Sequence, residues 1–136
     1  MADIRLARPG DVAWLEAHDP HIAASVLAHS IEQGWVYMAL VDGMRVGWLR
    51  YNLFWDNTPF LNLLYVLEEH RAQGVGSALM RRWEADMRAL HHPHVLTSTQ
   101  ANERAQHFYR KLGYEDVGGF KIRGEAYELI LCKTWE

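Results

Sequence analysis

The sequence predicts an α/β or α+β fold, in which helices cover both faces of a mixed β-sheet. Two observations lead to this prediction. Runs of strand and helix pattern follow one another in the order β-α-α-β-β-β-α-β-α-β-β, which gives about seven strands and four helices. Residues 60–67 are nearly all apolar, which is typical of a strand buried on both faces in the middle of a sheet.

The chain opens with a short strand and two helices. Residues 4–7 alternate between apolar and polar side chains, as a half-buried strand does. A Pro-Gly-Asp sequence ends this strand, and Asp11 is placed to cap a short helix. A second helix is expected over residues 21–33, with Gly34 as its end signal. Its apolar positions are Ile22, Val26 and Ile31.

The next two strands form a hairpin. Residues 35–41 and 46–54 are rich in β-branched and aromatic side chains, and the Asp42-Gly43 pair between them is a strong hairpin signal. A turn over residues 56–59 then leads into the apolar strand at 60–67. These runs supply the second, third and fourth strands.

The second half of the chain alternates helix and strand. A helix is expected over residues 75–90, followed by a strand at 95–99 and a helix at 103–112. Two last strands follow at 114–122 and 126–133. The long helix has one apolar stripe, formed by Val75, Leu79, Trp83, Met87 and Leu90.

Composition limits the classes of protein. The 136 residues suit one domain over residues 1–136, and 49% hydrophobic with 23% charged residues describe an ordinary globular chain. A net charge of -3 predicts no nucleic-acid partner and no anionic membrane surface. There is no apolar run of about 18 residues and no signal-peptide core, so we expect no membrane span. The single cysteine, Cys132, fits a cytoplasmic location.

A glycine-containing loop precedes the long helix. Gly74 and Gly76 stand where that helix should begin, Ser77 adds a hydroxyl, and Arg71 lies upstream. A helix start has about four backbone N–H groups without intrahelical partners, and glycine leaves them accessible to an anion. Two interpretations of the loop follow. It is either a turn with a purely structural role, or a site that binds a phosphate group.

Two common phosphate-binding motifs do not fit. A nucleoside triphosphatase loop requires Gly-Lys-Ser/Thr, whereas this chain has Gly-Ser-Ala. A dinucleotide-binding fold requires a third glycine near Met80 and an acidic residue near Ser98, and neither is present.

Two motifs in register resemble a known family. The run from Arg71 to Gly76 matches the Arg/Gln-x-x-Gly-x-Gly/Ala signature of the GCN5-related N-acetyltransferases. About 30 residues later, a second segment resembles that family's Asn-x-x-Ala-x-x-Phe-Tyr-x-x-x-Gly-Phe pattern. Its matching residues are Asn102, Ala105, Phe108, Tyr109, Gly113 and Tyr114. The resemblance implies the acyl-CoA N-acyltransferase fold, whose sheet is splayed between strands 4 and 5.

The resemblance also implies acetyl-CoA as co-substrate and no metal. The diphosphate would lie on the backbone N–H groups of the glycine loop, and the end of the fourth strand would pair with the pantetheine arm. The residues expected to bind the cofactor are Leu64, Tyr65, Val66, Arg71, Ala72, Gln73, Gly74, Val75, Gly76, Ser77, Asn102, Phe108 and Tyr109.

In such a reaction a neutral amine attacks the acetyl carbonyl directly, so Cys132 has no required role. Backbone N–H groups near Val66 could polarise the carbonyl. Tyr109 occupies the family's general-acid position, although a helix tyrosine without that motif would be read as a core residue. Asn102 either caps its helix, binds the pantetheine arm, or does both.

The general base stays unknown. The fourth-strand position where many relatives have an acidic residue corresponds to Asn62, with Leu63 beside it, and neither accepts a proton. The alternatives are bulk water, a water chain held by Asn62 and Thr99, or one of four side chains. These are Asp56, Glu68, Glu69 and His70.

The acceptor pocket is expected from the early helices with His29 and Glu32, the loop at residues 121–125, and aromatic residues near the fourth strand. Those aromatics are Trp48, Tyr51, Phe54, Trp55 and Phe60, with Trp48 and Phe54 sharing one strand face. Aromatic walls with Asp56 would favour a cationic amine over other acceptors, but a purely structural role is the alternative. The histidines at 91, 92 and 94 are expected in an exposed connection, not at a metal.

Together these features predict an acetyl-CoA-dependent N-acetyltransferase that acts on a small-molecule or peptide amine. Two alternatives remain. The chain is an inactive acyl-CoA-binding sensor or interaction domain, or it acetylates protein N-termini or lysines. A homodimer is compatible with the exposed aromatic residues.

Overall fold

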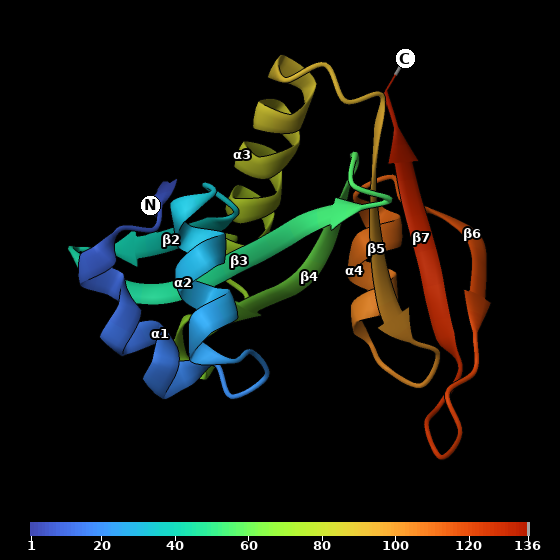
Figure 1. Ribbon diagram of the computed structural model, residues 1–136, viewed down its shortest axis with the longest axis horizontal. Coiled ribbons are helices and arrows are strands. Elements are labelled where there is room, and N and C mark those ends of the chain that lie inside the picture. The colour runs from blue at the N-terminus through green and yellow to red at the C-terminus, as the bar shows by residue number, and fades with distance from the viewer. Residues whose placement is uncertain (136) are drawn as a thin grey trace. The chain divides into compact units, whose positions relative to one another are not determined.

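The computed structural model describes residues 1–135. Seven strands form one sheet in the order β1-β2-β3-β4-β5-β7-β6 (Figure 1). The elements are β1 (Asp3–Leu6), η1 (Pro9–Asp11), α1 (Val12–His18), α2 (Ala24–Glu32), β2 (Val36–Val41), β3 (Met44–Phe54), β4 (Thr58–Val66), η2 (Glu68–His70), α3 (Val75–Ala89), β5 (His94–Gln100), α4 (Ala105–Lys111), β6 (Glu115–Phe120) and β7 (Glu128–Thr134). This confirms the predicted mixed sheet with four α-helices.

The chain divides into two compact units. The first unit comprises Met1–Asn52 and Leu63–Trp83, and the second comprises Leu53–Asn62 and Glu84–Glu136. The divisions fall inside β3, β4 and α3, so each unit contains part of these elements. The prediction of a single domain stays a prediction.

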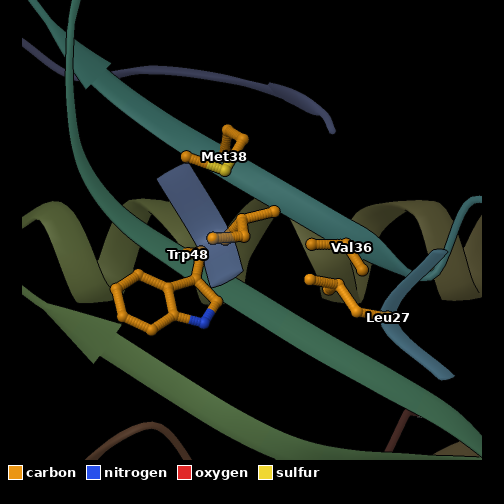
Figure 2. Close-up of a cluster of buried hydrophobic side chains, with 5 residues drawn as sticks. Leu27, Val36, Met38 and Trp48 are labelled. Atoms are coloured by element: carbon orange, nitrogen blue, oxygen red, sulfur yellow. The ribbon is translucent and has the colours of Figure 1, made fainter. Parts of the chain in front are cut away.

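The first unit has helices on both faces of its strands. On one face, α1 and α2 pack on β2 and β3 through a core of five buried side chains (Figure 2). These are Leu15, Leu27, Val36, Met38 and Trp48. On the opposite face, Trp83 of α3 contacts the ring of Tyr51, and the Arg82 guanidinium lies 5.7 Å from the ring centre of Tyr37. The period of two along a strand explains why neighbouring residues of β2 face different helices.

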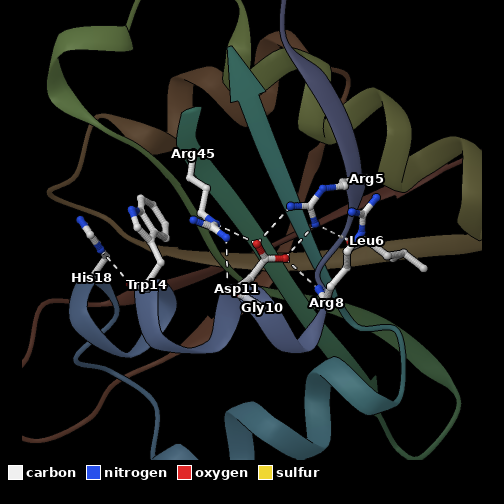
Figure 3. Close-up of polar contacts among 8 residues, drawn as sticks. All are labelled: Arg5, Leu6, Arg8, Gly10, Asp11, Trp14, His18 and Arg45. Carbon is white, nitrogen blue, oxygen red and sulfur yellow. Dashed lines mark hydrogen bonds and ion pairs between the residues drawn. The ribbon is translucent and has the colours of Figure 1, made fainter. Parts of the chain in front are cut away.

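Asp11 stands at the N-cap of α1, as predicted, but its side chain makes no capping bond to that helix. Its carboxylate is almost fully buried and accepts two hydrogen bonds from Arg5, at 2.8 and 3.1 Å, and one from Arg45 Nε at 2.8 Å (Figure 3). It also accepts the Arg8 backbone N–H at 2.8 Å. Although burial raises the pKa of Asp11, these bonds outweigh burial and hold it far below its usual value. Asp11 therefore joins β1 to β3 as a charged anchor.

A second buried carboxylate fixes the connection between α1 and α2. Asp19 accepts hydrogen bonds from Arg50 Nε at 2.7 Å and from Trp48 Nε1 at 3.0 Å. Burial opposes ionisation of Asp19, but the bonds from Arg50 and Trp48 lower its pKa overall. This anchor lies between the end of α1 at His18 and the start of α2 at Ala24.

Two predicted apolar positions are wrong. Val26 is 52% exposed, while Leu27 and Ser30 form the buried face of α2, which begins at Ala24 and not at residue 21. Leu90 is 62% exposed, because α3 ends at Ala89. The other four members of the α3 stripe are buried as predicted.

The second unit is built on β5. Its neighbour β4 is parallel, with Phe60 opposite Leu96 and Leu61 opposite Thr97. Strand β7 is antiparallel to β5 along the whole of both strands, and β6 pairs with β7 with an irregularity between Asp116 and Gly118. Helix α4 packs on β5. Among the described residues, no helix is long and apolar enough to cross a membrane.

Candidate active site

The loop before α3 has an open backbone. Residues 71–74 are exposed, and Ala72 and Gly74 have positive φ angles of 61° and 84°. The first intrahelical bond runs from the Ala78 N–H to the Gly74 carbonyl at 3.0 Å. Val75, Gly76 and Ser77 precede that bond, so the helix offers no acceptor for their N–H groups. Three consecutive donors thus stand at the positive end of a 15-residue helix.

Gly74 leaves this helix start uncovered. A Cβ placed at Gly74 would meet nothing within 4 Å, so the space beside the loop is empty of protein atoms. Ala72 has no such freedom, since a left-handed conformation costs a non-glycine residue about 1 kcal/mol. Strain of this kind is concentrated at functional sites. Buried Val75 holds the first turn of the helix against the first unit.

Arg71 turns back toward β4. Its Nε donates to the Val66 carbonyl at 2.8 Å, and its guanidinium lies 5.0 Å from the ring centre of Tyr65. The terminal nitrogens are therefore the part of Arg71 that could reach a phosphate. Tyr65 is 41% exposed, and Leu64 and Val66 are half-buried.

A close approach of β3 holds the end of β4. A Cβ at Gly47 would lie 2.8 Å from the Tyr65 carbonyl oxygen and 3.4 Å from Val66 Cα. The Leu67 N–H donates to the Val46 carbonyl at 2.8 Å. The segment expected to pair with pantetheine is thus fixed by β3 on one edge, while the Val66 carbonyl already accepts one bond from Arg71.

In the second unit, Tyr109 of α4 is 7% exposed. The Thr97 hydroxyl of β5 donates to the Leu61 carbonyl at 3.2 Å. Burial raises the pKa of Tyr109 to about 12, the nearby Thr97 hydroxyl opposes this rise, and the charge of Glu103 adds to it. Tyr109 is therefore protonated at neutral pH.

Other aromatic residues hold the Tyr109 ring in place. Phe108 and Tyr114 both contact it edge-on, with ring centres 5.4 and 5.7 Å away. The Tyr114 hydroxyl donates to Glu84 at 2.8 Å, and Lys133 forms a 2.8 Å ion pair with the same carboxylate. Burial and the nearby Glu84 charge raise the pKa of Tyr114 far above its usual value. The ring of Tyr109 thus packs against Tyr114, which is itself held in place by its hydrogen bond to Glu84.

Asn102 does not cap α4, which corrects one of its two expected roles. The N-cap residue is Arg104, and it makes no side-chain capping bond. Asn102 lies in an exposed turn, where the Glu103 carboxylate accepts the Gln100 N–H and the Gln106 side-chain amide donates to the Ala101 carbonyl. A role of Asn102 toward pantetheine stays a prediction.

The base candidates lie in different places. Asp56 is exposed in the β3–β4 turn, where its φ angle is 64°. Thr99 donates to Glu103 at 3.3 Å, so its hydroxyl hydrogen is already engaged. Glu68 and Glu69 are exposed in η2 of the first unit, and His70 is half-buried there.

The aromatic residues expected around the acceptor pocket fall in both units. Trp48 is buried against Trp14 and Tyr65 in the first unit. In the second unit, Phe54 contacts Trp55 and Phe60 and is 44% exposed, so it does not share the buried environment of Trp48. Figure 3 shows Trp14 beside His18, and these rings stack at 3.9 Å. Among residues 1–135, no group of three or more histidine, cysteine, aspartate or glutamate side chains could hold a metal ion. The histidines at 91, 92 and 94 therefore do not form such a group.

Comparison with known proteins agrees with the two sequence motifs. A model of the Acetyltransferase (GNAT) family matches residues 4–114. No curated protein matches the chain.

Solved structures share the fold. Ard1 from Thermoplasma volcanium is similar with a TM-score of 0.84 at 18% identity, over 98% of this chain and 97% of that chain. Arabidopsis thaliana Naa50, in complex with the bisubstrate analogue CoA-Ac-MVNAL, is similar with a TM-score of 0.82 at 17% identity, over 98% and 99%. An acetyltransferase of the GNAT family from Bacillus cereus is similar with a TM-score of 0.76 at 25% identity, over 98% and 97%.

The family match spans most of the chain and includes both motifs. The chain therefore belongs to the Acetyltransferase (GNAT) family of acetyl-CoA-dependent N-acetyltransferases.

Proposed function

We propose that this enzyme transfers the acetyl group of acetyl-CoA to a primary amine, and that the loop before α3 holds the cofactor diphosphate. One observation carries the proposal. The three N–H groups of residues 75–77 have no acceptor within the helix, and Gly74 before them leaves open space. A diphosphate supplies the negative charge and the acceptor oxygens that such a helix start favours.

The described residues suit a direct transfer without a covalent intermediate. The amine attacks the acetyl carbonyl, the thioester C–S bond breaks, and the thiolate of CoA leaves. Tyr109, with its pKa near 12, keeps its proton more firmly than a thiol with a pKa of about 8.5. Tyr109 therefore stabilises the leaving thiolate by hydrogen bonding, and complete proton transfer is uphill.

The lack of an acidic side chain on β4 favours an acceptor that is already neutral. Asn62 and Leu63 stand at this place, and neither removes a proton from an ammonium group. At pH 7.4 roughly a quarter of α-amines are neutral, against about one in a thousand lysine side chains. We therefore propose the α-amine of a polypeptide as the preferred acceptor, and the fold is shared with a structure that holds a peptide-like bisubstrate analogue.

Thiol release from acetyl-CoA tests this proposal. Three acceptors are compared: peptides with a free N-terminus, the same peptides with a blocked N-terminus and one lysine, and small polyamines. The free N-terminal peptides should react fastest. A preference for blocked lysine peptides or polyamines would contradict the α-amine assignment. If acetyl-CoA binds but no acceptor causes thiol release, the alternative of an inactive acyl-CoA-binding sensor would be supported instead.

A further inference from the structure

Strand β6 of the second unit has an open outer edge. Among the described residues it pairs with β7 on one side only, and it is the last strand in the order of the sheet (Figure 1). All six of its residues are exposed. The backbone N–H and C=O groups along such an edge can pair with another extended chain.

Exposed apolar side chains lie along this edge. Val117 is 58% exposed, Phe120 is 49% exposed, and Ile122, just after the strand, is 58% exposed. A Cβ at Gly118 would meet nothing within 4 Å, so the space beside the centre of the strand is open. The irregularity between Asp116 and Gly118 limits a regular ladder to the residues that follow it.

The two ends of this segment carry opposite charges. Glu115 begins β6 and Arg123 follows its end, and both are exposed. Each lies four residues from Gly119, on opposite sides. In an antiparallel pair of two such segments, with Gly119 opposite Gly119, Glu115 of each copy is therefore opposite Arg123 of the other. Opposite charges across an antiparallel pair are stabilising and like charges are destabilising, so this pattern favours a second copy of the same chain as the partner.

The neighbouring charges are engaged within each copy. Asp116 forms a 2.9 Å ion pair with Arg110 of α4, and the Lys121 ammonium group donates to the Glu125 carbonyl. Reversal of either charge would disturb contacts inside one molecule. The two outer charges are therefore the ones whose reversal reports on association.

We propose that β6 is a self-association surface, to which a second copy of this chain adds its own β6 in antiparallel orientation about Gly119. The backbone groups of residues 118–120 form the ladder, the apolar side chains beside it lose contact with water, and the pairs of Glu115 with Arg123 fix the orientation. The loop at residues 121–125, which is expected to line the acceptor pocket, follows β6 directly, so the same contact restrains that loop. Association needs neither cofactor nor acceptor, and it stands or falls independently of the proposed function.

Sedimentation velocity over a concentration series tests this surface without catalysis. Because the ladder is short, we expect a weak dimer whose fraction rises with concentration into the millimolar range. Glu115→Lys and Arg123→Glu should each raise the Kd of the dimer by about tenfold, since each creates two like-charge pairs in a symmetric interface. Exposed charge reversals cost little stability, and circular dichroism checks that both variants fold. A monomer at every concentration would overturn the proposal.

An equimolar mixture of the two variants gives the sharper result. In a mixed dimer both charge pairs again have opposite signs, one native and one reversed, so the mixture should associate although each variant alone does so poorly. Persistent monomers in the mixture, or dimers that neither reversal weakens, would contradict the pairing. Val117→Lys should also weaken the dimer, because it places a charge among the apolar side chains of the edge; an unchanged dimer would likewise count against this surface.

Glu16→Lys and Arg81→Glu are the matched controls. They make the same two charge changes at exposed positions of the first unit, outside β6. Each should dimerise as the native chain does. If the controls lose the dimer to the same degree as the β6 reversals, net charge and not strand pairing governs association, and the proposal is wrong.

Discussion

The hydroxyl of Tyr109 is one oxygen on a ring that is otherwise fixed by packing. Tyr109→Phe keeps the edge-on contacts with Phe108 and Tyr114 and removes only that oxygen. We expect kcat to fall about 100-fold, because donation to the leaving group is lost, while acetyl-CoA affinity changes little. Steady-state kinetics and calorimetry on the same preparation measure both quantities.

Tyr114→Phe is the matched control, since it removes another buried tyrosine hydroxyl from the same unit. It breaks the bond to Glu84 and should lower stability by about 1 kcal/mol without a comparable loss of kcat. If Tyr109→Phe lost affinity and turnover to the same degree, Tyr109 would be a residue of the fold only.

Asp11 makes stability depend on pH. Its folded-state pKa lies below its unfolded value near 3.9, so its contribution is complete above about pH 5 and is lost as the pH falls further. Asp11→Asn should cost roughly 3 kcal/mol at pH 7, the low end for a buried pair because Arg5 and Arg45 are partly exposed. Urea unfolding from pH 7 to pH 3 should show a shallower pH dependence in the variant; parallel curves would contradict this role.

Residue roles were only partly predictable from the sequence. Tyr109 was found through a motif, whereas the bond from Thr97 to the Leu61 carbonyl was not, because a threonine in a strand carries no sign of its hydrogen-bond partner. Asp11 was read as a cap from its neighbours. Its partners Arg5 and Arg45 lie 6 and 34 residues away, and only the folded sheet brings them together.

The start of α3 can be tested by introducing a carboxylate. Gly74→Glu should abolish acetyl-CoA binding, because it places negative charge where the diphosphate is expected. Gly43→Glu is the control: its φ of 78° matches the 84° of Gly74, and both positions have nothing within 4 Å of a Cβ. Both variants should therefore lose similar stability, and only Gly74→Glu should lose binding in calorimetry. Retained binding in Gly74→Glu would remove the loop assignment.

The end of β4 depends on the close approach of Gly47. Gly47→Ala places a methyl group 2.8 Å from the Tyr65 carbonyl oxygen. Because this oxygen belongs to the backbone of β4, it cannot move aside as the end of a flexible side chain could. We expect a loss of about 1–3 kcal/mol and weaker acetyl-CoA binding, since the β4 end must move. Gly10→Ala, with nothing within 4 Å of its Cβ, should leave both unchanged. Equal behaviour of the two variants in thermal unfolding and binding would refute this.

At the scale of elements, strong apolar patterns were reliable and boundaries were not. The apolar run at 60–67 and the stripe from Val75 to Met87 correspond to β4 and α3. Helix α2 begins three residues later than predicted, after the loop that Asp19 fixes through Arg50 and Trp48. Such an anchor depends on long-range contacts that a local pattern does not contain.

At the scale of the whole molecule, the spatial order of the strands was not predicted from the sequence. Local patterns give the seven strands in sequence, but they do not place β7 between β5 and β6. The acceptor was the least predictable feature, because the aromatic residues near β4 divide between the buried core and an exposed turn. The acceptor specificity depends on which side chains the folded chain brings together at the site, and the fold class does not supply this information.

The central claim is that the backbone donors at the start of α3 bind the cofactor diphosphate. Isothermal titration of the enzyme with acetyl-CoA and with S-acetylpantetheine, which has the thioester but no diphosphate, tests it most directly. Two or more charge-assisted hydrogen bonds predict that acetyl-CoA binds at least about 100-fold more tightly. Equal affinity for the two ligands, with the protein folded, would contradict the claim.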